Sequence, residues 1–466
     1  MTPTSLLAAG ADAPYLEGSA LNLLWCIPFV GLLLSIAVFP LVAEDFWHAH
    51  FGKIALMWAT ILFFPMVVML GSSVFLFELL HIALLEYFPF VILLLSLFTI
   101  SGGIKFESQL FGTPILNVLF LLVGTFIASF TGTTGAAILL IRPLLEANKK
   151  RQYKTHTVVF FIFLVANIGG SLTPLGDPPL FLGFLKGVDF FWPLQNLLLP
   201  MLFVSGVLLL IYFVLDSWFF KREKPEVANI KQPHQNLIKS LSTIKVKGGI
   251  NFILLLGVLS MVLLSGIWKP NISFNVYHID VELQNLVRDA TLLVLVLLSL
   301  RLTSPKLRAD NGFTWFPIVE VAKLFAAIFF TVAPVIAILR AGDQGSLSAI
   351  TNMISDSNGQ PINSLYFWVT GILSSFLDNA PTYLVFFNTA GGDPAVLTST
   401  LNNTLLAISA GAVFMGAVSY IGNAPNFMVR SIAIEQGIKM PSFFGFMAWS
   451  CCFLMPIFLL VTVIFF

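Results

Sequence analysis

Two carboxylates lie within strongly apolar stretches of the chain, where a charged side chain is unusual. Asp177 follows Thr173 in one polar break, and Asp378 lies in a second break that ends at Thr382. If these stretches cross a membrane, each carboxylate is expensive to bury and is usually functional, because it binds an ion or a proton. The alternative is structural, since an Asp can cap a half-helix by accepting a hydrogen bond from a free backbone N–H.

Polar side chains that could supply oxygen ligands accompany both carboxylates. A hard cation such as Na⁺ needs several oxygen ligands, at least one of them anionic, to replace its hydration shell. We therefore take Asp177 and Asp378 as Na⁺ candidates. The polar residues that could complete an ion or substrate site are Asn167, Thr173, Asn379, Thr382, Ser419, Asn423 and Asn426. Their alternative role is hydrogen bonding between helices.

Other charged residues allow more than one interpretation. Arg142 and Arg430 could pair with an ion, bind a carboxylate, or extend to the cytoplasmic membrane surface. His48 and His50 could form a pH sensor or a metal site, but their expected position in a loop favours a solvated cluster. The sequence contains no phosphate-binding loop and no Ser/His/Asp or metal-hydrolase arrangement, so it supports neither ATP drive nor an enzyme.

The amino-acid composition indicates that the chain is a helical membrane protein. Hydrophobic residues make up 58% of the chain, charged residues make up 10%, and the mean hydropathy is +0.93. An average soluble domain contains about 25% charged residues. The net charge of +1 gives no reason to expect a nucleic-acid partner. Cys26, Cys451 and Cys452 lie in apolar runs without metal-type spacing, so we expect neither a metal site nor a disulfide framework there.

One stretch, residues 163–185, is apolar at both ends but cannot form a continuous helix. It reads FLVANIGGSLTPLGDPPLFLGFL, with three prolines and three glycines in its polar centre. Proline removes a backbone donor and glycine weakens a helical turn. At membrane depth the freed backbone groups must be buried in protein or face a wet cavity. We therefore expect two half-helices joined by an unwound linker, an architecture typical of binding sites in secondary transporters.

The remaining stretches predict an all-α polytopic membrane protein that lies in a lipid bilayer. We expect ten crossings, at 21–42, 54–78, 80–100, 157–186, 192–216, 250–268, 287–302, 314–340, 403–433 and 443–466. Re-entrant hairpins are expected at 114–145 and 363–390. With this count, the basic clusters at 149–154, 217–249 and 301–308 all fall in the cytoplasm, as the positive-inside rule requires. Both termini then lie outside.

The chain also matches itself at an offset of 246 residues. Ser129 falls on Ser375, and Asp177 falls on Asn423, without a gap between the hairpin tip and the broken helix. Each half has five crossings, an odd number, so the halves form an inverted-topology repeat, each with one re-entrant hairpin and one broken helix. The expected domains are an N-terminal tail (1–20), a first repeat (21–216), a cytoplasmic linker (217–249) and a second repeat (250–466).

This pattern resembles the ion transporter superfamily, which includes divalent-anion/sodium symporters, citrate carriers, arsenite permeases and NhaD-type sodium/proton antiporters. The hairpin tips Thr131–Thr134 and Leu377–Thr382 carry the resemblance, together with the broken-helix motifs Thr173–Pro179 and Ile421–Asn426. The most similar group is bacterial, with members described as citrate transporters and as sodium/proton antiporters. The resemblance implies a sodium-type site between each tip and its broken helix, which adds Thr133, Thr134, Gly176 and Gly422 to the candidates.

The resemblance further implies an elevator-type transporter, in which a transport domain moves against a scaffold, usually within a homodimer. The expected location is the bacterial cytoplasmic (inner) membrane. Sodium-coupled carboxylate carriers of this superfamily have Ser-Asn-Thr at both hairpin tips. Neither tip of this chain has that motif, which leaves the transported species open.

The leading hypothesis is a sodium(cation)/proton antiporter, in which one carboxylate binds Na⁺ and H⁺ in turn. Burial favours the protonated carboxylate and a bound cation favours the ionised one, so competition at one site is sufficient for exchange. Na⁺ and H⁺ are then the coupling ions, and we expect no other cofactor. The alternative is a sodium- or proton-coupled carrier of citrate or another dicarboxylate, whose anion could meet helix N-termini and Arg430.

Overall fold

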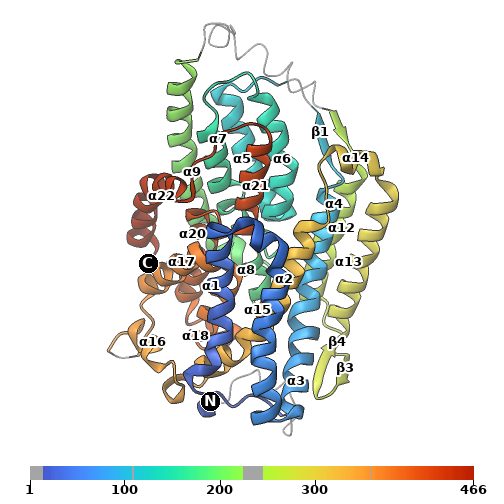
Figure 1. The fold of residues 1–466 in the computed structure, drawn as a ribbon, viewed down its shortest axis with the longest axis vertical. Helices are drawn as coiled ribbons and strands as arrows, with labels where there is room; N and C mark the ends of the chain where they lie inside the picture. The colour runs from blue at the N-terminus through green and yellow to red at the C-terminus, as the bar shows by residue number, and fades with distance from the viewer. Residues whose placement is uncertain (1–13, 108–109, 224–244, 358) are drawn as a thin grey trace.

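The computed structural model describes residues 14–107, 110–223, 245–357 and 359–466. Within these ranges the protein is mostly α-helical, as Figure 1 shows. Nine of the described helices are long and apolar enough to cross a membrane: Leu23–Val42, Asp45–Leu70, Ser72–Ser101, Pro114–Thr131, Trp192–Phe220, Ile250–Ile267, Leu283–Leu302, Phe316–Arg340 and Phe443–Phe465. The expectation of a polytopic helical membrane protein is therefore confirmed.

These nine helices do not correspond one to one with the ten expected crossings. Pro114–Thr131 is the first arm of the first expected hairpin, and the other eight correspond to expected crossings. The two expected broken helices appear instead as the shorter apolar helices Thr155–Ser171 and Asn402–Val418, because each stops at its polar break. The polar breaks therefore make the helices of these two segments shorter than the helices that are long enough to cross a membrane.

The N-terminal third corrects two predicted boundaries. It contains η2 (Gly18–Ala20), η3 (Leu23–Cys26), α1 (Ile27–Val42), α2 (Glu44–Pro65), η4 (Met66–Leu70), α3 (Ser72–Ile82), η5 (Ala83–Tyr87) and α4 (Phe88–Ser101). The loop expected to hold His48 and His50 is helical, since α2 begins at Glu44. The turn between the second and third crossings lies at Gly71, not near 79. Gly71 has φ 96°, a conformation that glycine adopts without steric penalty.

The two hairpins and the two broken helices form the centre of the molecule. In the first half they are α5 (Pro114–Thr131), α6 (Thr133–Ala147), α7 (Thr155–Leu164), η6 (Ile168–Ser171) and α8 (Pro178–Leu185). In the second half they are α17 (Asn363–Leu377), α18 (Asn379–Thr389), α20 (Asn402–Met415), η8 (Gly416–Val418) and α21 (Ala424–Glu435). Figure 1 shows the hairpins α5–α6 and α17–α18 in opposite halves of the long axis, with α8 between them.

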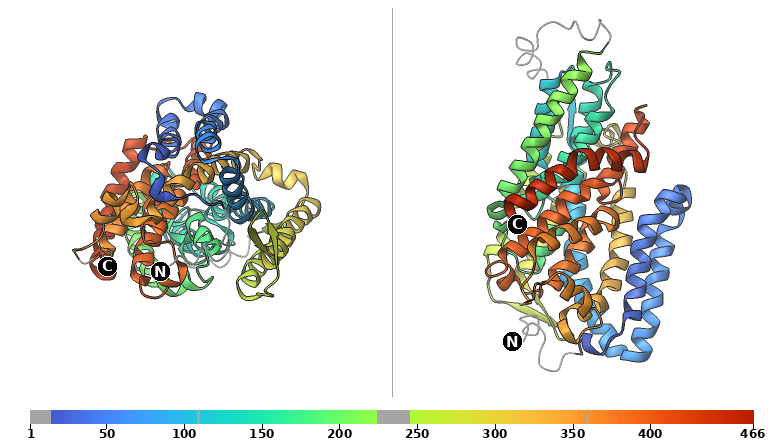
Figure 2. Two further views of the ribbon diagram at one scale, coloured as in Figure 1. Left: turned by 90° about the horizontal axis from the view of Figure 1, so that it is seen from below. Right: turned by 90° about the vertical axis from the view of Figure 1, so that its left-hand side faces the viewer.

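Further helices surround this centre. They are α9 (Trp192–Phe220), α12 (Ile250–Ile267), α13 (Leu283–Leu302), α14 (Pro305–Asp310), α15 (Phe316–Arg340), α16 (Ser348–Met353), η7 (Gly342–Gln344), α19 (Pro394–Leu397) and α22 (Phe443–Phe465). Figure 2 shows α1 and α2 at one edge of the molecule and α12 and α13 at another. The hydrophobic core runs through the centre, where every residue from Val158 to Ala166 is fully buried.

Two short antiparallel ribbons add β structure that an all-α fold class does not include. Strand β1 (Lys105–Glu107) pairs with β2 (Lys245–Lys247), and β3 (Ser273–Val276) pairs with β4 (Ile279–Glu282). The expected linker 217–249 lies largely outside the described residues, which omit 224–244. Its described ends extend α9 to Phe220 and supply strand β2. The loop after α4 and the end of the linker therefore meet at one end of the molecule.

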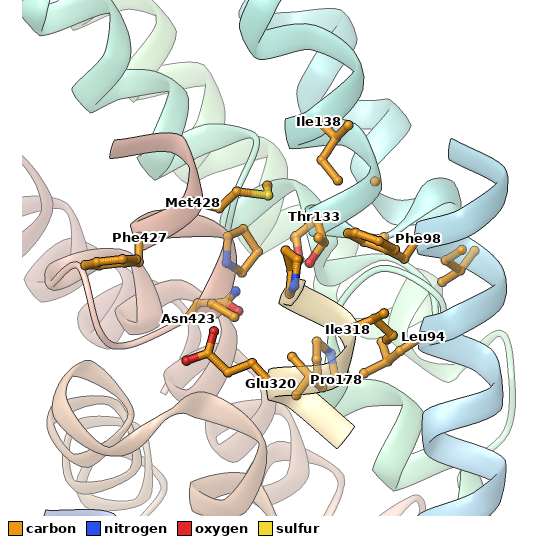
Figure 3. Close-up of a pocket in the computed structure, with 18 of the residues that line it drawn as sticks. Leu94, Phe98, Thr133, Ile138, Pro178, Ile318, Glu320, Asn423, Phe427 and Met428 are labelled. Atoms are coloured by element: carbon orange, nitrogen blue, oxygen red, sulfur yellow. The ribbon is translucent and has the colours of Figure 1, made fainter. Parts of the chain in front are cut away.

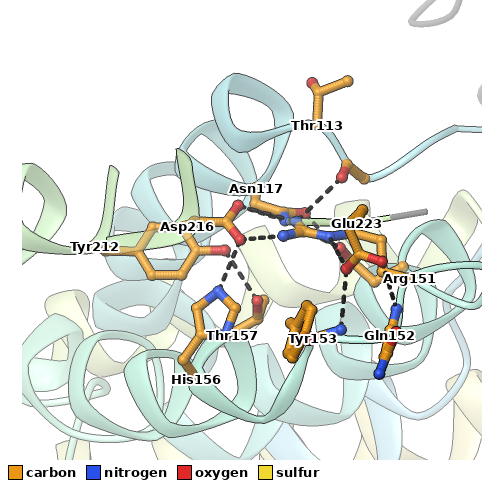
Figure 4. A network of polar contacts seen from close by, with 12 residues as sticks. Thr113, Asn117, Arg151, Gln152, Tyr153, His156, Thr157, Tyr212, Asp216 and Glu223 are labelled. Carbon is orange, nitrogen blue, oxygen red and sulfur yellow. Dashed lines mark hydrogen bonds and ion pairs between the residues drawn. The ribbon is translucent and has the colours of Figure 1, made fainter. Parts of the chain in front are cut away.

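A buried ionic network fastens α9 to the first hairpin and to α7 (Figure 4). Asp216 Oδ1 lies 2.5 Å from a guanidinium nitrogen of Arg151 and 2.7 Å from His156 Nε2. Asn117 on α5 donates to Asp216 Oδ2 at 3.1 Å. Glu223 accepts backbone N–H groups of the loop that carries Arg151. Because the Arg151 and Asp216 side chains are fully buried, each charge depends on its partners in this network.

Candidate functional site

The first hairpin tip is hydrogen-bonded to its broken helix through backbone and side-chain groups. Thr133, the first residue of α6, donates its backbone N–H to the Gly176 carbonyl at 2.8 Å. The Thr173 hydroxyl donates to the Ser129 carbonyl, and the Ser129 hydroxyl donates to the Gly169 carbonyl at 2.5 Å. The unwound linker around Thr173 thus has its polar groups paired with the tip of the hairpin instead of with a helical turn.

The second half repeats these contacts at the offset seen in the sequence. The Ser419 hydroxyl donates to the Ser375 carbonyl, as Thr173 does to Ser129, which lies 44 residues before it in both pairs. The Ser375 hydroxyl donates to the Met415 carbonyl at 2.9 Å. The two halves therefore use equivalent positions to hold an unwound linker against a hairpin tip.

Glycine permits a close approach inside both linkers. A Cβ atom built on Gly176 would collide with the Gly170 carbonyl, and one built on Gly422 would collide with the Gly416 carbonyl. Both obstacles are backbone atoms, which cannot move aside as a flexible side chain can. Gly176 and Gly422 are therefore structural members of the candidate site, and they need to remain glycine for the linkers to fold this tightly.

Asp177 is the point at which the two halves meet. Its Oδ1 accepts hydrogen bonds from the Thr133 hydroxyl at 2.9 Å and from Asn423 Nδ2 at 3.0 Å. Its Oδ2 accepts a hydrogen bond from Asn379 Nδ2. These donors come from the first hairpin tip, the second broken helix and the second hairpin tip. One carboxylate, only 2% exposed, is therefore held by three elements that are far apart in the sequence.

The amide of Asn379 has an unused oxygen beside this carboxylate. Asn379 is fully buried, and its Oδ1 has no hydrogen-bond partner in the described structure. A buried polar atom without a partner is rare and calls for an explanation, such as an ion or water that belongs there. Together with Asp177, this oxygen is a candidate ligand for a cation.

Asn167 and Asn426 join the two broken helices directly. Asn167 Nδ2 donates to Asn426 Oδ1 at 2.6 Å, and Asn426 Nδ2 donates to the Gly416 carbonyl at 2.8 Å. Asn423 Nδ2 also lies 3.3 Å from Asn167 Oδ1. These amides are occupied by contacts between helices, which is the alternative role considered for them in the sequence. They position Asn423 against Asp177.

Asp378 is placed differently from Asp177. It caps α18, where its Oδ1 accepts the Ala380 N–H at 3.1 Å and its carbonyl accepts the Thr382 hydroxyl at 2.8 Å. Its φ of 74° matches that of Gly132, φ 78°, at the tip of the other hairpin. A residue with a side chain is strained in this region. The Asp378 side chain therefore acts as a helix cap, which is the structural role considered for it above. The same side chain also lines the cavity described next.

A cavity of about 500 Å³ opens in front of this cluster (Figure 3). Six of the candidate residues line it: Thr133, Thr134, Gly176, Asp177, Asp378 and Asn423. The remaining candidates, Asn167, Thr173, Asn379, Thr382, Ser419, Gly422 and Asn426, are not among its lining residues and support the cluster through the contacts above. The cavity also meets exposed residues of the loop after α14, so it reaches the surface at that end of the molecule.

The structure adds four charged or titratable residues that the sequence interpretation had set aside or missed. They are His48 on α2, Arg142 on α6, Glu320 on α15 and Glu435 on α21, all of which line the cavity. His48 packs its ring near Phe316 and Phe427, with centroids 6.0 and 5.9 Å away, and is not part of a solvated loop. For Glu320 a signal was present, because it is a carboxylate within a predicted apolar crossing.

Apolar spanning helices are typical of a multi-pass membrane protein, and the cavity of this one is built around a buried carboxylate. A family model with the description "putative citrate transport" matches residues 18–466, and the chain belongs to this family. This match agrees with the expected relation to the citrate-transporter members of the ion transporter superfamily and identifies a secondary transporter. A comparison with curated proteins found no match.

Proposed function

We propose that this protein is a sodium(cation)/proton antiporter in which Asp177 binds Na⁺ and H⁺ in turn. The observation that carries the proposal is the convergence of Thr133, Asn379 and Asn423 on the Asp177 carboxylate. A site that contains one carboxylate can hold either a cation or a proton, but not both. Each ion therefore displaces the other, which is the requirement for exchange.

The residues around Asp177 have the chemistry to hold either ion. For Na⁺, the Thr133 hydroxyl oxygen, the unpartnered Asn379 Oδ1 and nearby linker carbonyls would join the carboxylate as hard oxygen ligands. For H⁺, the protonated carboxyl would donate to Asn379 Oδ1 after a half-turn of that amide, since an amide presents an acceptor on one side and donors on the other. Asn379 thus serves both states of the site.

We further propose that the described conformation is open to the cytoplasm. The cavity reaches the surface near α14, beside the basic loop 301–308 that the positive-inside rule assigns to the cytoplasm. At the opposite end Lys186 forms an ion pair with Glu86, and Arg340 Nε donates to Asn388 Oδ1 at 2.8 Å. This proposal includes three further expectations. The inverted repeat moves as an elevator, the protein forms a homodimer, and both termini lie outside the bacterial inner membrane.

A coupled carrier of citrate or another dicarboxylate is the second candidate. The family description favours it, and so does Arg142, which lines the cavity without an ion pair or hydrogen bond to any described residue. In this candidate, Arg142 would bind a substrate carboxylate and Asp177 would hold the coupling ion. Arg430 is less suited, because its guanidinium lies over the rings of Tyr420 and Phe427 at 5.2 and 5.6 Å.

Sodium-driven pH change and uptake of labelled citrate, measured side by side in proteoliposomes, separate the two candidates. Wild type should exchange Na⁺ for H⁺, and Asp177→Asn should fold but lose at least about 90% of the exchange, because Asn keeps the size and one oxygen acceptor but cannot titrate. Asp177→Glu should keep part of the activity with a changed pH profile. The matched control is Asp393→Asn, since Asp393 caps α19 through the Ala395 N–H outside the cavity.

Two results would reject the proposal. Exchange by Asp177→Asn with the rate and pH profile of wild type would show that Asp177 is not the shared ligand. Citrate uptake by wild type without Na⁺/H⁺ exchange, lost in both Asp177→Asn and Arg142→Gln, would establish the carboxylate carrier instead.

A further inference from the structure

We infer that Glu320 attracts the cation into the cavity and acts only from the side to which this cavity opens. The inference rests on the proposed cation/proton exchange at Asp177. It concerns a residue outside the hairpins and the broken helices, which are the elements that carry the Asp177 cluster.

Glu320 faces the cluster across the cavity. It lies near the start of α15, it is half-buried, and it lines the cavity. Figure 3 shows its carboxylate pointing into the cavity toward Asn423, whose amide donates to Asp177 Oδ1 at 3.0 Å. Trp47 and His48 of α2 lie beside the Glu320 carboxylate. A cation that enters the cavity therefore passes between Glu320 and the Asp177 cluster.

The residues beside the Glu320 carboxylate differ from those that hold Asp177. Trp47 and His48 of α2 lie beside Glu320, although helix α15 as a whole packs against α1, α2, α4 and also α18. Asp177 begins α8 and accepts hydrogen bonds from the first residues of α6 and α18 and from Asn423, which precedes α21. Among the described lining residues from α1, α2, α4 and α15, Glu320 is the one carboxylate. If the hairpins and broken helices move relative to α15 during transport, Glu320 faces Asp177 in only one of the two states.

The charges around the cavity favour a cation. Its described lining contains the carboxylates Asp177, Asp378, Glu320 and Glu435, against the single permanent cation Arg142. A cleft whose walls carry mostly one sign of charge concentrates ions of the opposite sign and raises their rate of entry. Removing one carboxylate near the path should therefore weaken the apparent affinity for Na⁺ without altering the site at Asp177 itself.

The test compares Glu320→Gln with Glu320→Asp, and uses Glu146→Gln as a matched control. Glu146 is an exposed carboxylate at the end of α6 that pairs with Lys149 and does not line the cavity. Sodium-dependent proton movement is measured in everted and in right-side-out membrane vesicles, so that added Na⁺ meets one face or the other. Thermal unfolding in detergent and size-exclusion profiles show whether each variant folds.

Glu320→Gln should raise the KM for Na⁺ by about fivefold to tenfold when Na⁺ is added at the cavity side, as expected for the loss of one charge in a partly wet cleft. The kcat and the KM measured from the opposite side should not change. Glu320→Asp should restore most of the affinity, and Glu146→Gln should match wild type.

Two outcomes would overturn the inference while leaving the proposed function standing. One is a Glu320→Gln variant whose KM equals that of Glu146→Gln, and the other is an equal rise in KM from both faces. A wild type without sodium-dependent proton movement, or an Asp177→Asn variant that retains it, would overturn the proposed function and with it the inference.

Discussion

Asp177 and Asp378 carry the same carboxyl group in different surroundings. Asp177 accepts hydrogen bonds from Thr133, Asn379 and Asn423, so both halves of the chain determine its position. The Asp378 carboxylate accepts a local backbone N–H, from Ala380 two residues ahead of it, while it faces the same cavity. A carboxylate that several elements share can couple ion binding to a movement of these elements, whereas a local cap cannot. We therefore place the exchange at Asp177.

The strain at Asp378 gives a prediction at the scale of a single residue. Its φ of 74° and ψ of 139° lie where glycine is normally required, as at Gly132 in the other tip. Asp378→Gly should therefore stabilise the protein, because relief of about 1–3 kcal/mol of strain exceeds the few tenths lost with the cap. Thermal unfolding in detergent should show a higher Tm, and exchange should fall because the cavity loses a carboxylate.

The matched variant is Gly132→Ala, which introduces the same strain at the other tip and should lower the Tm. If Asp378→Gly exchanged Na⁺ for H⁺ at the wild-type rate, Asp378 would be a cap alone. If it also lowered the Tm, the positive φ would not be a source of strain.

At the scale of elements, two kinds of polar contact hold the first half together. The unwound linker of the broken helix is bonded to the hairpin tip, through Thr173 and Ser129 among others. At the other end of these elements, the ionic network of Asp216 joins α5, α7 and α9 (Figure 4). Since polar contacts hold these helices together at both ends, we expect α5 to α9 to behave as one rigid unit and to move together if they move at all.

The buried network predicts a large effect on stability. Asp216→Asn should lower the free energy of unfolding by about 3–5 kcal/mol, because it removes the nearest anion from the buried Arg151 guanidinium and leaves only the more distant Glu223, at 3.6 Å, to balance that charge. Glu107→Gln is the matched control, since Glu107 pairs with Lys247 at the surface and should leave the Tm unchanged. Thermal unfolding of purified variants measures both. Equal Tm values for the two variants would mean that the Asp216 network is not needed for stability.

At the scale of the whole molecule, the two ends of the cavity region differ. One end is open beside α14, and the other is closed by the ion pair of Glu86 on η5 with Lys186 at the end of α8. Arg340 at the end of α15 adds a second polar contact there, to Asn388 on α18. Both contacts join the helices that surround the centre to the helices that carry the cluster. Any movement between these two groups of helices must therefore break them.

This arrangement predicts that a covalent link at the closed end stops transport. In a background without native cysteines, Glu86→Cys with Lys186→Cys should be joined by a short bis-methanethiosulfonate cross-linker, which replaces the reach of the two longer side chains. The cross-link should abolish Na⁺/H⁺ exchange, and a reductant should restore it. Each single cysteine variant serves as a control and should keep its exchange after the same treatment. Full exchange by the cross-linked protein would show that α8 does not move relative to η5 during transport.

Local chemistry was sufficient to predict the broken helices and the hairpin tips from the sequence. Proline and glycine alter the backbone wherever they occur, so the break at Thr173–Pro179 could be recognised without a structure. The hairpin tips could be recognised because Ser129 and Ser375 occupy equivalent positions at the 246-residue offset. The turn at Gly71 and the two β ribbons were missed, because a single glycine or a short polar strand has no distinctive local pattern.

The resemblance already implied that each hairpin tip lies beside its own broken helix, but the tertiary structure alone decided that both tips and both broken helices meet at one carboxylate. Asp177 and Asn379 are 202 residues apart, and their contact depends on how two hairpins and two broken helices pack. The same packing brings Glu320 and His48 to the cavity, although neither lies near a predicted motif. Backbone conformation is set within a few neighbouring residues, whereas the surroundings of a buried carboxylate are set by helices from the whole chain, and this is why the sequence predicted the elements but not their meeting point.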